Sequence, residues 1–144
     1  MRWLEFGLVL ALVLGVGAAA AEEKEQRVDV ELMVSQVSSA PGEIDPRGLK
    51  LHKTLQDQFR YGSLRVLQIR RLQLALNEVG SVVLPNGKSL RVRPLQVSAD
   101  GVLMAVDVEG AARMDLKVRN GHLVVIGAER YQDGKLVISL EPRW

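Results

Sequence analysis

Apolar and polar residues alternate over long stretches of this chain. The alternation is clearest at 113–119, where Met114, Leu116 and Val118 are separated by charged residues. The same period of two runs through 27–34. Because successive side chains of a strand point to opposite faces, both segments predict strands with one buried face.

Tight-turn signals divide the rest of the chain into further strands. Pairs of Asn or Asp with Gly accept the positive φ angles that antiparallel hairpins need. The pairs are Asn86-Gly87, Asp100-Gly101, Asn120-Gly121 and Asp133-Gly134. The strands predicted around them are 82–84, 90–97, 102–108, 113–119, 123–126 and 136–140. Pro94 cannot donate to a ladder, so its strand is expected at an edge or at a bulge.

The segment 63–78 is the most ambiguous one, because it is long and apolar enough for a helix or a strand. Its apolar residues change parity near the middle. We interpret it as a long strand with a bulge around 68–71, where one extra residue exchanges the faces. A helix remains the alternative.

One helix is predicted over about 46–60. Asp45 can accept hydrogen bonds from exposed backbone N–H groups, and Pro46 suits the first helical position. Leu51 and Phe59 belong to an apolar stripe with four-residue spacing. The fold class is therefore mainly β: an antiparallel β-sandwich or partly open barrel with one inserted helix.

Residues 1–21 have the three parts of a secretory signal peptide. Arg2 precedes an apolar run at 7–17, and small residues end at Ala21. The apolar stretch is shorter than the roughly 20 residues that span a bilayer, so cleavage is expected rather than anchoring. Residues 22–144 are then a single β-rich domain in the periplasm or outside the cell, without a stable membrane span.

Composition narrows the possible partners. The chain has no Cys, and 19 Lys and Arg stand against 17 Asp and Glu, a net charge of +2. Disulfides and thiolate zinc sites are excluded. Nearly balanced charge and a few scattered aromatic residues argue against a nucleic-acid partner.

Catalytic and metal-binding signatures are missing from the sequence. His52 and His122 are the two histidines, and neither stands in a metal-ligand spacing such as H-x-x-x-H. The serines do not stand in a G-x-S-x-G turn. We therefore expect no metal, no cofactor and no enzymatic activity.

Arginines are the candidate partner-binding residues. If strands 63–78 and 90–97 are neighbours, their arginines line one stripe that holds carboxylate or phosphate groups of a protein or an anionic envelope polymer. The alternative is a solvated face paired with Asp107, Glu109 and Asp115. The candidates are Arg65, Arg70, Arg71, Arg91 and Arg93.

Three segments carry a resemblance to a known family. They are I-D-P with L-x-x-x-L-x-x-x-F-x-Y at 44–61, L-P-N-G-K-x-L-x-V at 84–92, and D-G-K-L-V-I-S-L at 133–140. In these the chain resembles an uncharacterised family of small exported bacterial β-rich proteins. The resemblance implies a fold and carries no functional residues with it.

The sequence thus predicts a non-catalytic binding or scaffolding domain, an accessory of an envelope or secretion assembly. A small exported enzyme or enzyme inhibitor with an unrecognised site is the alternative. Trp144 is either an exposed docking tag or packs back on the domain.

Overall fold

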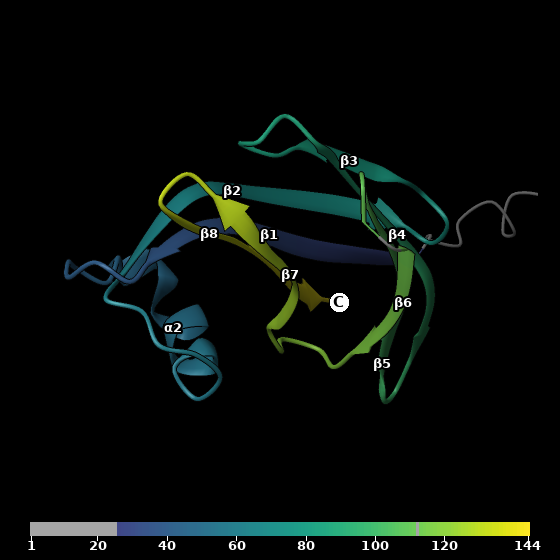
Figure 1. The fold of residues 1–144 in the computed structure, drawn as a ribbon. Coiled ribbons are helices and arrows are strands. Elements are labelled where there is room, and N and C mark those ends of the chain that lie inside the picture. The colour runs from purple at the N-terminus through teal and green to yellow at the C-terminus, as the bar shows by residue number, and fades with distance from the viewer. Residues whose placement is uncertain (1–25, 112) are drawn as a thin grey trace, which may run out of the picture.

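The computed structural model describes residues 26–111 and 113–144, so the predicted signal peptide at 1–21 lies outside the described residues. Within these residues, eight strands and one helix with a preceding 3-10 turn follow one another along the chain (Figure 1). They are β1 (Arg27–Ser38), η2 (Pro46–Gly48), α2 (Leu49–Leu55), β2 (Ser63–Ala75), β3 (Gly80–Val83), β4 (Ser89–Ser98), β5 (Gly101–Val108), β6 (Arg113–Val118), β7 (Val124–Tyr131) and β8 (Gly134–Arg143).

The strands form two four-stranded antiparallel sheets. Sheet A has the order β2-β1-β8-β7, and sheet B has the order β3-β4-β5-β6. Each sheet keeps two edge strands, so the architecture is an open sandwich rather than a barrel. The predicted mainly β fold with one inserted helix is confirmed. Among the described residues, no helix has the length and apolar character to cross a bilayer.

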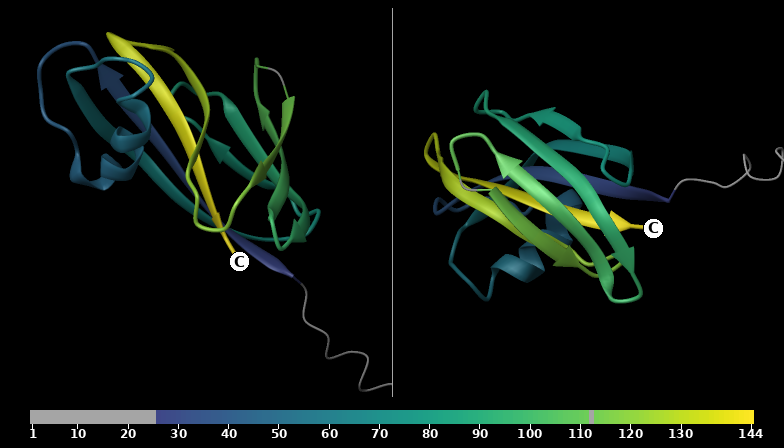
Figure 2. Two further views of the ribbon diagram at one scale, coloured as in Figure 1. Left: turned by 90° about the horizontal axis from the view of Figure 1, so that it is seen from below. Right: turned by 90° about the vertical axis from the view of Figure 1, so that its right-hand side faces the viewer.

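Sheet A is covered on both faces, and this creates two hydrophobic cores. Core 1 lies between the sheets and includes the even-numbered residues Val28 to Val34 of β1. Core 2 lies on the opposite face of sheet A, where Leu51 and Leu55 of α2 pack on Val37. Figure 1 shows α2 near the left-hand end of sheet A and sheet B at the right-hand end. From below, α2 and the green strands of sheet B lie on opposite sides of β8 (Figure 2).

The predicted helix is shorter than expected. Asp45 accepts from the backbone N–H of Arg47, as a cap should, but α2 ends at Leu55 instead of residue 60. The helix ends early because the chain has to return to sheet A by residue 62. There the N–H of Gly62 donates to the carbonyl oxygen of Ser38, and β2 begins at the next residue. The loop after α2 therefore carries part of the apolar stripe, and its aromatic residues still pack against core 2.

The ambiguous segment is strand β2 and not a helix. Val66 and Gln68 pair with consecutive residues of β1, so Leu67 is the extra residue of a bulge. The bulge lies one residue before the predicted range 68–71, and it exchanges the faces as predicted. Apolar even-numbered residues before it face α2, and those after it face sheet B.

Pro94 occupies a bulge in an inner strand. β4 lies between β3 and β5, and its register with β5 shifts between Pro94 and Gln96. Of the two expected positions for this proline, edge or bulge, the structure shows the bulge. The Pro94 carbonyl oxygen accepts from the N–H of Asn77 on the β3 side, so the missing N–H also faces that side, where the pairing with β3 has ended at Val92.

Two of the predicted turns differ from simple hairpins. Asn120-Gly121 joins β6 to β7, which belong to different sheets. The predicted Asp133-Gly134 turn is the β7–β8 hairpin, but the residue with positive φ there is Gln132, at 51°, and not a residue of that pair. Gly134 is needed there for another reason, since a Cβ would lie 2.1 Å from the carbonyl oxygen of Val37.

Trp144 packs back on the domain. Its ring is half-buried against core 1. The Asn120 amide donates to the Trp144 carbonyl oxygen at 3.0 Å and accepts from its backbone N–H at 3.3 Å. Of the two expected roles for this residue, the structure shows packing.

Candidate functional site

The five predicted arginines do not form one stripe. β2 belongs to sheet A and β4 to sheet B, so the expected adjacency of these strands is wrong. Arg91 and Arg93 lie opposite Asp107 and Ala105 on the outer face of sheet B, away from core 1. They are separated from the arginines of β2 because β2 pairs with β1 in sheet A and not with β4.

The three arginines of β2 also separate from one another. Arg70 lies opposite Leu32 and so on the face toward sheet B, whereas Arg71 is on the face toward α2 and donates to Glu31 at 3.2 Å. Arg65 donates to the side-chain oxygen of Gln36 at 3.1 Å. A partner-binding role for any one of these arginines stays a prediction, but they do not act as one surface.

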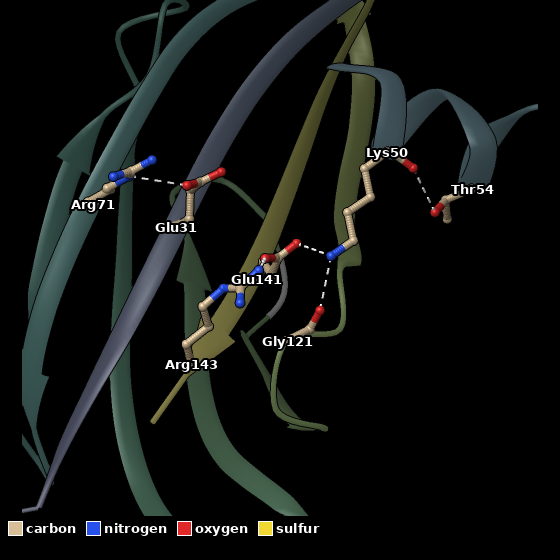
Figure 3. A network of polar contacts seen from close by, with 7 residues as sticks. All are labelled: Glu31, Lys50, Thr54, Arg71, Gly121, Glu141 and Arg143. Atoms are coloured by element: carbon tan, nitrogen blue, oxygen red, sulfur yellow. Dashed lines mark hydrogen bonds and ion pairs between the residues drawn. The ribbon is translucent and has the colours of Figure 1, made fainter. Parts of the chain in front are cut away.

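Charged residues cover the part of sheet A beyond α2 (Figure 3). Lys50 of α2 reaches Glu141 and the carbonyl oxygen of Gly121, and Arg143 donates to Glu141 at 2.7 Å. Burial tends to raise the pKa of Glu141, but the hydrogen bonds from Lys50 and Arg143 outweigh it and lower that pKa. The hollow here has ≈550 Å³ and balanced charge, lined by Lys50, Arg71, Arg143, Asp29, Glu31 and Glu141. This network ties α2 to sheet A.

Asp45 closes part of the free edge of β2. Its carboxylate accepts from the backbone N–H of Val66 at 3.1 Å, and Arg47 donates to the Val66 carbonyl oxygen at 3.1 Å. These two side chains take the place of a neighbouring strand. The hydrogen bond from the Arg47 guanidinium, aided by backbone N–H donors, holds the pKa of Asp45 far below its ordinary value.

Positive charge gathers in a hollow at the other end of sheet A. The hollow has ≈430 Å³ and lies where the end of β1, the loop after α2 and the β7–β8 hairpin meet. Three cations line it, Arg60, Arg130 and Lys135, against one carboxylate, Asp133. We call it the basic cleft.

The β7–β8 hairpin positions two of these cations. Arg130 and Lys135 are direct cross-strand partners, so their side chains leave sheet A on the same face. That face is the one toward α2, because Val37 of core 2 is the β1 partner of Lys135. The third cation, Arg60, comes from the loop after α2.

Aromatic rings support the cleft. Lys135 Nζ lies 5.1 Å from the centroid of the Phe59 ring, and the Phe59 and Tyr61 rings are 5.7 Å apart. The Tyr61 hydroxyl lies 2.6 Å from Nδ1 of His52, which fastens the loop to α2. Burial raises the pKa of this hydroxyl.

Within the described ranges, none of the three cations has a carboxylate within 4.0 Å. Asp133 instead accepts from the Gln36 amide at 3.2 Å. Guanidinium and ammonium groups that outnumber the one carboxylate around a hollow suit a carboxylate or a phosphate. The basic cleft is therefore the candidate ligand site.

A second hollow adjoins the basic cleft and has the opposite charge. It has ≈650 Å³, and its charged residues are Glu43, Asp45, Arg65 and Asp133. The two hollows share Ser38, Gln132 and Asp133 as a common border. We call this neighbour the acidic hollow.

Sequence reasoning missed Arg60, Arg130 and Lys135. The sequence signal for the hairpin was Asp133-Gly134. The two loop residues in the structure are Gln132 and Asp133, one position earlier, and this register makes Arg130 and Lys135 cross-strand partners. Arg60 offered no such signal, since its place depends on where α2 ends. Among the residues that the structure describes, His, Asp and Glu form no cluster suited to a metal ion.

Comparison with protein-family models, with curated proteins and with solved structures gave no match.

Proposed function

We propose that this chain is a non-catalytic, exported binding domain that takes up anionic groups of a protein or an envelope polymer at the basic cleft. One observation carries the proposal: Arg60, Arg130 and Lys135 face one hollow, and none has a carboxylate within 4.0 Å among the described residues. A role as an accessory of an envelope or secretion assembly is compatible with such a site.

The repulsion between Arg130 and Lys135 supports a binding role. Like charges directly opposite each other on neighbouring strands destabilise a sheet, and Arg130 faces Lys135 in this way. Structural stability alone gives no reason to keep this pair. An anion bound between the two side chains offsets their repulsion and so stabilises the complex.

Calorimetric titration of the purified protein with pentaglutamate tests the proposal. At low ionic strength we expect measurable binding that weakens as salt is added. The triple variant Arg60→Gln, Arg130→Gln, Lys135→Gln is expected to lose it, whereas the control Arg91→Gln, Arg93→Gln is expected to keep it. Equal loss in the control variant contradicts a site at the basic cleft.

Export is a separate part of the proposal and rests on the pattern of residues 1–21. We expect protein recovered from the periplasm or the medium to begin at Glu22, as read from its intact mass. An intact mass that includes Met1, found in the membrane fraction, contradicts cleavage.

A further inference from the structure

The geometry points to a peptide ligand that carries one anionic and one cationic group, rather than to a polyanion. This inference rests on the proposed function and narrows its ligand. Its basis is the pair of hollows of opposite charge that share one border.

The shared border is held in place by a buried side chain. Gln36 is 8% exposed and lies between two charged groups. Its amide nitrogen donates to Asp133 at 3.2 Å, and its amide oxygen accepts from Arg65 at 3.1 Å. Because Gln36 uses both ends of its amide, the Asp133 carboxylate is fixed at the boundary between the hollows.

The acidic hollow keeps negative charge after its internal contacts are counted. Asp45 is paired with Arg47 at 2.8 Å. Arg65 keeps its positive charge beside the neutral Gln36 amide and offsets one of the two remaining carboxylates, so a net negative charge is left. Among the described residues, Glu43 has no cation within 4.0 Å. Its backbone is fixed, since its carbonyl oxygen accepts from the N–H of Leu64 at 3.1 Å. Glu43 and Asp133 therefore suit an amine.

Charge complementarity then selects the ligand class. A uniform polyanion that fills the basic cleft meets like charge at Glu43 as it crosses the border, and like charges oppose binding. A short peptide with a carboxylate and an amine satisfies both hollows at once. Its carboxylate lies against Arg130 and Lys135, and its amine lies against Glu43 and Asp133.

The test compares two synthetic peptides by titration. One is acetyl-Gly-Glu-Gly-Lys-Gly-amide, and the other is the same peptide with its lysine acetylated, which removes the positive charge. In the wild-type protein we expect acetylation to weaken binding about fivefold, as for one partly exposed ion pair. In Glu43→Gln that difference should vanish, while Arg130→Gln should weaken both peptides.

The outcomes separate this inference from the proposed function. If Arg130→Gln weakens both peptides while acetylation changes nothing, the cleft binds anions but the zwitterionic ligand is overturned. Tighter binding of pentaglutamate than of the unmodified peptide overturns it as well. If Arg130→Gln and Lys135→Gln leave all affinities unchanged, the proposed function fails too. Circular dichroism of each variant is the control that tests whether the variant is folded.

Discussion

Arg130 and Lys135 lie directly opposite each other in the β7–β8 hairpin, on the face of sheet A toward α2. Two positive charges in this position repel each other, and Lys135 Nζ makes a cation–π contact with the Phe59 ring that offsets part of this repulsion. The relationship links folding to the proposed function, because the two positive charges that weaken the hairpin are the ones that we propose bind an anion.

Reversing one of these charges should stabilise the fold. Arg130→Glu converts a like-charge pair into an opposite-charge pair and is expected to raise the free energy of unfolding by about 0.5–1 kcal/mol. Urea denaturation measures this change. Arg93→Glu, opposite Ala105 in sheet B, is the matched control and should change stability little. A less stable Arg130→Glu protein contradicts the account of the cleft.

Two buried serines on one face of sheet A should respond differently to truncation. Within the part of the chain that the structure describes, Ser35 Oγ has no hydrogen-bond partner, whereas Ser139 Oγ donates to the Met33 carbonyl oxygen. Ser35→Ala is therefore expected to raise the free energy of unfolding by about 1 kcal/mol. Ser139→Ala should lower it or leave it unchanged. The reverse order, measured by urea denaturation, speaks against the described packing of core 2.

Acid should remove the contribution of Asp45 to stability. The Arg47 hydrogen bond lowers the pKa of Asp45 in the folded state below its unfolded value of about 3.9. A lowered folded pKa means that the carboxylate stabilises the fold fully above the unfolded pKa and loses this effect as pH falls through the folded one. Asp45→Asn should therefore lower the unfolding temperature at pH 7, and the gap from wild type should narrow below about pH 4. A gap that stays constant with pH rules out this role.

Because of the bulge in β2, deleting Leu67 and deleting Arg70 should lower the stability of the fold by different amounts. Val66 and Gln68 already point to opposite faces, so removing Leu67 leaves a regular alternation and should cost about 1–3 kcal/mol from lost burial. Removing Arg70 keeps Leu72 on its face only if the bulge closes, which turns Gln68 and Ile69 to the other faces, so we expect a larger loss of stability than for removal of Leu67. Circular dichroism and thermal melting distinguish the two. Equal tolerance of both deletions contradicts the observed register.

Much of the fold was predictable because strand alternation is a local signal. β6 follows its pattern closely, with Met114, Leu116 and Val118 packed against core 1. β7 extends beyond the predicted 123–126 to Tyr131. Its register with β8 shifts between Val125 and Gly127, and this bulge interrupts the apolar alternation on which the prediction depended.

The site was less predictable because it depends on which strands become neighbours. The sequence suggested that the arginines of β2 and β4 share a surface, but β2 returns to pair with β1. The basic cleft combines Arg60 from a loop with Lys135 from a hairpin more than 70 positions later. Arg60 and Lys135 line the same hollow because α2 ends at Leu55 and because the β7–β8 hairpin has the register observed.

The most direct measurement is a titration of the ¹⁵N-labelled protein with pentaglutamate, followed by NMR chemical shifts. The account predicts that the largest shifts fall on Ser38, Ser39, Arg60, Arg130 and Lys135, which line the basic cleft. Largest shifts around Arg91 and Arg93, with the cleft unaffected, would contradict it.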